Sequence, residues 1–147
     1  MNKMKVLLTF DVDGETLWLN RDPDNINRPV TLSLGQYGPN RGLPRILNIL
    51  KKYDIPATFF VPGKTAEDFP NTVPSIMAGG HEVAHHSYYH KWPDRYETRE
   101  EEEADYKKGS AVIEPILGHK MVGYRSPAWE YSKNTLDILE DMGIEYT

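Results

Sequence analysis

Four of the chain's five histidines lie within the ten residues HEVAHHSYYH, at positions 81 to 90. Imidazole transfers protons or binds metal ions, and each use predicts different partner residues elsewhere in the chain. His86 and His90 are four residues apart, a spacing that lets two imidazoles converge on one ion from a helix or a tight turn. One added carboxylate would complete a His₂Asp set with an open position for water, which is the composition of a catalytic zinc site.

The segment TFDVDGE, residues 9 to 15, supplies candidate carboxylates. Asp11 and Asp13 flank Val12 at the end of an apolar run, so in a strand both side chains point to the same side. Two close carboxylates repel each other unless a cation lies between them or one is protonated. An ordinary Asp-Gly turn explains the same residues without any chemistry, and this stretch alone leaves both interpretations open.

A third segment of interest is GYRSPAWEYS, residues 123 to 132. Arg125 follows an apolar run, and a fixed arginine can pair with a carboxylate and keep it ionised. Trp129, close behind Pro127, suits the flat face of a sugar ring. A generic ion pair for Arg125 and core packing for Trp129 are the alternative interpretations.

Strand and helix patterns alternate along the chain. Short apolar runs predict five strands, at residues 5–10, 57–61, 81–85, 121–124 and 144–147. The first of these runs, KVLLTF, has the continuous apolar character of a strand covered on both faces. Helical periodicity predicts helices at residues 42–53, 66–78, 98–117 and 132–142.

This βαβαβαβαβ order predicts parallel strands with helical crossovers, and hence an α/β fold. In α/β barrels and open α/β sheets the active site lies at the C-terminal ends of the strands. The aspartates, the histidine pair and the arginine all follow predicted strands directly, so we expect them to meet at that edge.

Several other residues have structural expectations. Pro70 and Pro74 are expected to break the helix over 66–78, and Pro115 to kink or end the helix over 98–117. The acidic run at 100–103 points all round a helix, which predicts a solvated surface and not a metal site. His85 is expected in the core or behind the site, and His119 on the surface.

Composition excludes several functional classes. The chain has 147 residues, which is enough for a single core. Its formal charge of -5 does not indicate a binding surface for nucleic acid or anionic lipid. It has no cysteine, which excludes disulfides and thiolate metal sites. The first apolar run is too short for a secretory signal, and no stretch is long enough to span a membrane. These features predict a cytoplasmic enzyme or binding protein without nucleic-acid or membrane partners.

The three segments together resemble the polysaccharide deacetylase family, whose shared domain is the NodB homology domain (carbohydrate esterase family 4). TFDVDGE resembles its first motif, TFDDG, with one residue inserted between the aspartates. HSYYH resembles the second motif, H-S/T-x-x-H, and YRSPAW resembles the third. GHEVAHH and ATFFVPG are also similar to that family. The match covers essentially the whole chain, so one domain is expected over residues 1–147.

The resemblance implies roles for the residues in these motifs. Asp11 would be the general base, and Arg125 would orient it and keep it ionised. Zn²⁺, or another divalent transition metal, would be held by Asp13, His86 and His90.

The same resemblance assigns Pro127 and Trp129 to the lining of the substrate groove. It also implies a distorted (β/α) barrel, of which about five parallel strands are expected here. We therefore expect the chain to be the N-terminal part of such a barrel, without the later motifs that supply a general acid. An unclosed barrel leaves strand edges exposed, which favours association into a homo-oligomer.

The expected function is metal-dependent hydrolysis of non-peptide C–N bonds, above all removal of N-acetyl groups from amino sugars of a polysaccharide or peptidoglycan. One alternative is an allantoinase-like amidohydrolase of small ureides or cyclic imides, with the long polar connection at residues 25–40 capping a small pocket. Another is a non-catalytic fragment that binds a metal or a sugar and lacks the general acid.

Overall fold

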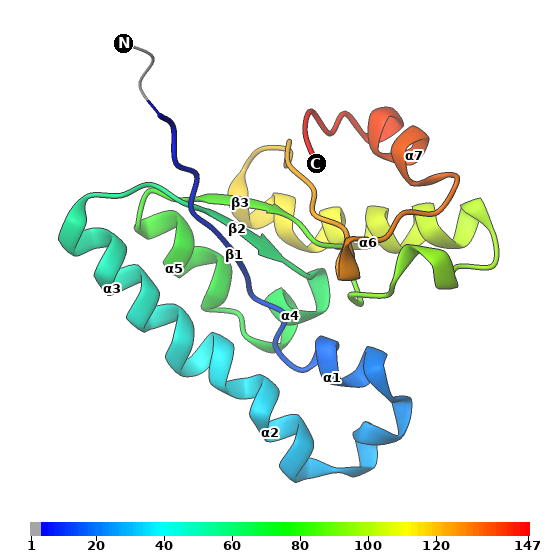
Figure 1. The fold of residues 1–147 in the computed structure, drawn as a ribbon, viewed down its shortest axis with the longest axis horizontal. Helices are drawn as coiled ribbons and strands as arrows, with labels where there is room; N and C mark the ends of the chain where they lie inside the picture. Colours follow the sequence, from blue (N-terminus) through cyan, green and yellow to red (C-terminus); the bar gives the residue numbers. More distant parts are fainter. Residues whose placement is uncertain (1–3) are drawn as a thin grey trace.

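A three-stranded parallel sheet forms the centre of the computed structural model, which describes residues 4–147 (Figure 1). In spatial order its strands are β1 (Thr9–Asp11), β2 (Thr58–Val61) and β3 (Glu82–His85). The register places Asp11 opposite Phe60, and Phe60 opposite Ala84. Because the strands run parallel, their C-terminal ends lie at one edge of the sheet, and the predicted α/β fold is confirmed.

Seven α-helices are present in residues 4–147: α1 (Thr16–Arg21), α2 (Pro29–Tyr37), α3 (Leu43–Tyr53), α4 (Gly63–Asp68), α5 (Thr72–Ala78), α6 (Arg99–Leu117) and α7 (Thr135–Met142). Shorter helical turns are η1 (Pro23–Asn27), η2 (Gly38–Gly42), η3 (Pro93–Arg95) and η4 (Pro127–Trp129). Figure 1 shows α2, η2 and α3 following one another along one side of the molecule. Within this part of the chain no helix is long and apolar enough to cross a membrane.

The hydrophobic core lies between the sheet and its helices. From the strands it takes Phe59, Val61 and Val83, all of which are buried. Helices α3, α5 and α6 supply most of the remainder, including Leu43, Leu50, Val73, Ile76 and Ile113. Burial of each such side chain contributes roughly 2 kcal/mol to folding. This packing fixes the strands, and with them the residues that follow each strand.

A second, smaller cluster attaches the C-terminal segment to α6. It consists of Tyr106, Tyr124, Ile138 and Leu139, all buried. Tyr124 belongs to the segment that was predicted as the fourth strand, so this cluster positions the residues that come directly after it.

The predicted fourth and fifth strands are present only as isolated parallel bridges, which pair His85 with Tyr124 and Gly123 with Tyr146. Backbone hydrogen bonds continue the sheet order through these bridges, from Arg125 N–H to the His85 carbonyl (3.0 Å) and from Tyr124 N–H to the Tyr146 carbonyl (3.0 Å). Among residues 4–147, residues 144–147 have strand-like pairing on one side only. The full ladder expected from sequence therefore does not form there.

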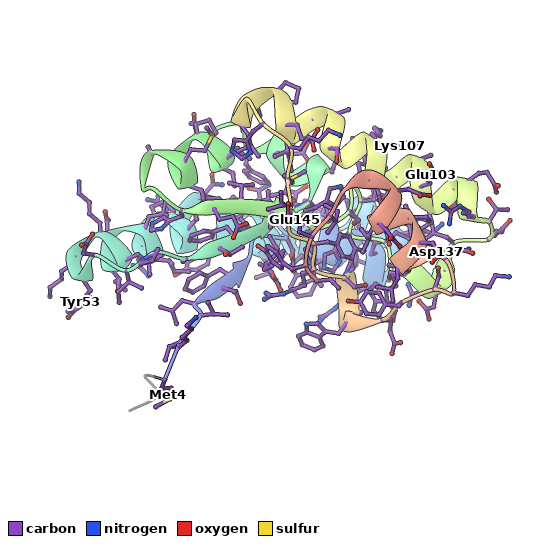
Figure 2. All side chains as sticks on the ribbon, turned by 90° about the horizontal axis from the view of Figure 1, so that it is seen from above. Met4, Tyr53, Glu103, Lys107, Asp137 and Glu145 are labelled. Atoms are coloured by element: carbon purple, nitrogen blue, oxygen red, sulfur yellow. The ribbon has the colours of Figure 1, made fainter. Side chains whose placement is uncertain are left out.

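The first strand is shorter than predicted. It begins at Thr9, whereas Val6 is 74% exposed and Leu7 is 86% exposed. Figure 2 shows the segment that ends at Met4 projecting from the body of the protein. The expectation that residues 5–10 are covered on both faces is thus wrong, since Thr9 is exposed as well. β1 is an edge strand, and Leu8 and Phe10 are the residues of this run that pack against the core.

Other departures from the sequence expectations concern helices. Residues 25–40, expected as a long polar connection, contain α2 and parts of η1 and η2. The break expected at Pro70 is confirmed, because α4 ends before Pro70 and α5 begins after it, but Pro74 lies within α5 and does not break it. Pro115 does not end its helix, since α6 continues to Leu117.

The expectation that the acidic run at 100–103 is a solvated surface is wrong for Glu102, which is fully buried. Its carboxyl group accepts hydrogen bonds from the hydroxyls of Tyr106 (2.9 Å), Ser132 (2.6 Å) and Thr135. The neighbouring Glu103 instead forms an ion pair with Lys107 on the outside of α6 (both labelled in Figure 2). One residue along a helix is a rotation of about 100°, which turns position 102 toward the start of α7.

Glu102→Ala should lower the free energy of unfolding by about 3 kcal/mol, because three hydrogen bonds worth about 1 kcal/mol each are lost. Urea denaturation with a fitted m-value measures the change. Glu103→Ala is the matched control, and loss of its exposed ion pair should change stability by less than about 1 kcal/mol. Equal effects of the two substitutions would contradict the structural role of Glu102.

Candidate metal centre

The predicted ligands Asp13, His86 and His90 come together. Each offers one ligand atom, and these atoms lie within 4.8 Å of one another. His86 Nε2 is 3.4 Å from Asp13 Oδ1, and His90 Nε2 is 3.6 Å from Asp13 Oδ2. Both histidines are buried. In residues 4–147 this is the one group of three or more such side chains close enough to share an ion.

The backbone after β3 turns both imidazoles toward the same point. Ser87 (φ 60°) and His90 (φ 61°) adopt left-handed conformations, which cost a non-glycine residue roughly 1–2 kcal/mol. The N–H of His90 donates to Ser87 Oγ (2.8 Å), which closes the turn. Strained residues of this kind cluster at functional sites, where surrounding contacts hold them in place.

The orientation of His86 is fixed by a hydrogen bond on its far side. Its Nδ1 lies 2.6 Å from the carbonyl oxygen of Arg125. Because a carbonyl oxygen can only accept, Nδ1 carries the proton, and the lone pair of Nε2 faces Asp13. A metal-binding histidine is typically held in this way by an acceptor behind it.

The electrostatics of the cluster favour the protonation states that bind metal. Burial acts to raise the pKa of Asp13, but the imidazoles of His86 and His90 and the guanidinium of Arg125 outweigh burial and lower it. Burial, followed by the charge of His86, lowers the pKa of His90 to about 4. An ionised carboxylate and a neutral ring at neutral pH are the forms that coordinate a metal.

The donor set fits a divalent transition metal. Asp13 Oδ1 is buried, and no group within residues 4–147 donates a hydrogen bond to it, which is costly for a carboxylate oxygen unless a cation compensates its charge. Two imidazole nitrogens and one carboxylate suit zinc and also suit iron, cobalt, nickel or manganese. The residues present therefore match the metal implied by the sequence.

Asp11 and Arg125 form the predicted pair beside this cluster. Arg125 Nη1 donates to Asp11 Oδ1 (2.6 Å), and Nη2 donates to Thr9 Oγ1 (2.6 Å). The guanidinium carbon lies 4.1 Å from the centre of the Phe60 ring, a cation–π contact. The ring and the hydroxyl hold the arginine in place, and neither contact was identified from the sequence.

The cluster and Asp11 open onto one cavity of about 360 Å³. It is lined by Asp11, Asp13, Leu17, Arg21, His86, His90, Trp92, Ser126, Ala128 and Trp129. Sequence reasoning missed Leu17, Arg21, Trp92, Ser126 and Ala128. The spacing of Leu17 and Arg21, four residues apart just after the first motif, was the available signal for one helical face at the site.

The two predicted groove residues differ in position. Trp129 is 81% exposed, so core packing is excluded for it, and it lines the cavity. Pro127 is buried and does not line the cavity. No residue from 25–40 lines it either, because α2 and its flanking turns occupy that stretch. The idea that this stretch caps a small pocket is therefore wrong.

His85 and His119 are located as expected. His85 is buried, and its Nε2–H donates to the carbonyl oxygen of Tyr106 (2.8 Å) while Nδ1 accepts from the N–H of Ser87 (3.0 Å). His119 is exposed. Through its hydrogen bond with the Ser87 N–H, His85 thus supports the turn that carries His86 and His90.

Comparison with known proteins decides which family this arrangement represents. The sequence profile described as Polysaccharide deacetylase matches residues 1–147. The chain belongs to the polysaccharide deacetylase family. This membership confirms the family resemblance that was inferred from the three motifs.

The domain is similar to several named proteins. It is 34% identical over 141 residues to a peptidoglycan deacetylase of Helicobacter pylori, covering 92% of this chain and 46% of that protein. It is 37% identical over 140 residues to a peptidoglycan-N-acetylglucosamine deacetylase of Bacillus cereus, covering 92% of this chain and 40% of that protein.

A crystal structure of a Mycobacterium smegmatis protein named as a polysaccharide deacetylase superposes with a TM-score of 0.88 at 40% identity. That match covers 94% of this chain and 48% of the other. The polysaccharide deacetylase domain described here thus spans about half the length of the relatives that it matches, and its fold is confirmed as part of the family's α/β fold.

The combined substitutions His86→Ala and His90→Ala should abolish stoichiometric zinc binding, because a single carboxylate cannot hold the ion at micromolar concentration. Metal content after equilibration with zinc and removal of excess metal gives the measurement. His119→Ala is the matched control, and its metal content should equal that of the wild type. Zinc retained by the double variant would show that other residues are the ligands.

Proposed function

We propose that this polysaccharide deacetylase domain acts in metal-dependent hydrolysis of the N-acetyl amide of an amino sugar. The observation that carries the proposal is the shared cavity, which Asp11, held by its ion pair with Arg125, lines together with the His₂Asp cluster. The similar proteins of H. pylori and B. cereus, named for deacetylation of peptidoglycan, support a substrate of that class. Cytoplasmic location and homo-oligomer formation stay predictions.

The proposed metal ligands are Asp13, His86 and His90, with Zn²⁺ as the expected ion. When bound there, a divalent metal supplies Lewis-acid activation of water and of the amide carbonyl. The hydrogen bond from His86 to the Arg125 carbonyl keeps the ligand nitrogen aimed at the site. The protein thus provides a preformed set of donors, which limits the reorganisation needed on binding.

Asp11 is the proposed general base. Its Oδ1 accepts from Arg125, so Oδ2 is the oxygen that can take a proton from water. The arginine is itself held by Thr9 and by the Phe60 ring, which fixes the direction of the carboxylate. Base and metal ligands line the same cavity, which is the first geometric requirement for the two to act on one substrate.

Trp129 is the proposed platform for the sugar. Its side chain is 81% exposed at the rim of the cavity, and its left-handed backbone (φ 57°) holds it outside the core. An exposed indole gives a flat apolar surface on which a sugar ring can stack. Trp92 lines the same cavity and adds a second aromatic wall.

Asp11→Asn should lower kcat for acetate release by about 10²- to 10⁴-fold, because the amide cannot accept the proton of water. The zinc-loaded protein is assayed on chitooligosaccharides and on peptidoglycan fragments. Zinc content should be unchanged, since Asp11 is not one of the proposed ligands.

Turnover equal to that of the wild type would contradict the role of Asp11. If the zinc-loaded wild type itself releases acetate from none of these substrates, the non-catalytic alternative is favoured for this chain. Turnover of cyclic imides or ureides without acetate release from sugars would favour the small-ring alternative.

A further inference from the structure

One carboxylate from outside the metal-ligand turn binds its backbone. Asp105, on α6, accepts hydrogen bonds from the N–H of Tyr88 (2.8 Å) at Oδ2 and from the N–H of Tyr89 (3.4 Å) at Oδ1. These two tyrosines are two of the three residues between His86 and His90. Both oxygens of one side chain are therefore used by the segment that joins the two proposed ligands.

The other N–H groups of this turn have local acceptors. The N–H of Ser87 donates to His85 Nδ1 (3.0 Å), and the N–H of His90 donates to Ser87 Oγ (2.8 Å). Among the acceptors found in residues 4–147 for the N–H groups of 87–90, Asp105 alone belongs to a distant element. It is the contact that ties the conformation of the turn to the rest of the fold.

The carbonyl side of the turn is held by a different helix. The N–H groups of Gly63 and Lys64, at the start of α4, donate to the carbonyls of Ser87 and Tyr88 (both 3.0 Å). The turn is thus clamped between the backbone of α4 on one side and a single side chain of α6 on the other. The contact from α6 can be removed by a side-chain substitution, whereas the contacts from α4 are made by backbone groups.

The close approach of α6 makes this contact possible. A Cβ placed on Gly109, one turn after Asp105, would lie 3.0 Å from both His85 Nε2 and the Ser87 carbonyl oxygen. The glycine therefore lets the helix axis come near the turn. At that distance the short side chain of aspartate reaches both backbone N–H groups.

We propose that Asp105 is a positioning residue of the metal centre, which sets metal affinity by holding the left-handed turn between His86 and His90. The proposal rests on the proposed metal site, and it assigns to α6 a role that neither the motifs nor the ligand geometry identify. Asp105 touches neither the metal nor the substrate. It acts through the backbone of Tyr88 and Tyr89.

Asp105→Asn is the sharpest test because it keeps size and shape but replaces one accepting oxygen with an NH₂ group that faces a backbone N–H. Zinc affinity should fall by about 10- to 100-fold, the range found for residues that orient metal ligands. Competition with a chromophoric chelator measures it. Asp137→Asn, an exposed change on α7 (labelled in Figure 2), is the matched control and should bind zinc as the wild type does.

Two further readouts separate positioning from a general effect on stability. Excess zinc should restore the acetate release of Asp105→Asn toward the wild-type rate, which a globally unfolded protein would not show. Amide hydrogen exchange at residues 88 and 89 should be faster in the variant, while exchange in β2 stays unchanged.

The possible failures are distinguishable. If the wild type binds zinc and the double histidine variant does not, while Asp105→Asn matches the wild type in affinity and exchange, the positioning role is wrong and the metal site stands. If exchange in β2 rises as much as exchange at residues 88 and 89, Asp105 acts on the whole fold and the proposal is overturned. If the wild type binds no zinc, the proposal falls together with the metal site.

Discussion

Arg125 is the residue on which the geometry of the site depends. Its side chain donates to Asp11, its carbonyl oxygen accepts from His86, and its backbone N–H continues the sheet by donating to His85. The proposed base and one proposed ligand are therefore oriented by two ends of the same residue. Any shift of this segment relative to β3 would change both orientations together, which makes the parallel pairing at His85 and Tyr124 a requirement of the site.

The sequence predicted most of the site because its residues carry their chemistry in their types and in their places after strands. Two aspartates, two histidines and an arginine each follow an apolar run, and parallel pairing brings such positions to one edge. Asp105 and Glu102 could not be found in this way. They belong to a long acidic helix, and what distinguishes them from Glu101 or Glu103 is only the side of α6 on which they lie and what packs there.

The fold class was predictable from the sequence, but the lengths of the first and last strands were not. The order of strands and helices follows from periodicity, but how far a strand extends depends on whether a neighbour pairs with it or covers it. Val6 and Leu7 have the composition of a buried strand and yet are exposed, because β1 is at the edge of the sheet. Residues 144–147 likewise pair at a single bridge. Such outcomes are set by tertiary partners, which local composition does not encode.

Helix α6 has a consequence for how the cavity meets a ligand. Glu102 is bonded to the segment just beyond Trp129, and Asp105, less than one turn later, is bonded to the turn that holds the histidines. Helix α6 thus holds both the segment that follows Trp129 and the turn that carries His86 and His90. The spacing between these two parts of the cavity is therefore set before a sugar binds. A glycan would therefore bind in a preformed cavity and not in one that closes around it, and little ordering entropy would be lost on binding.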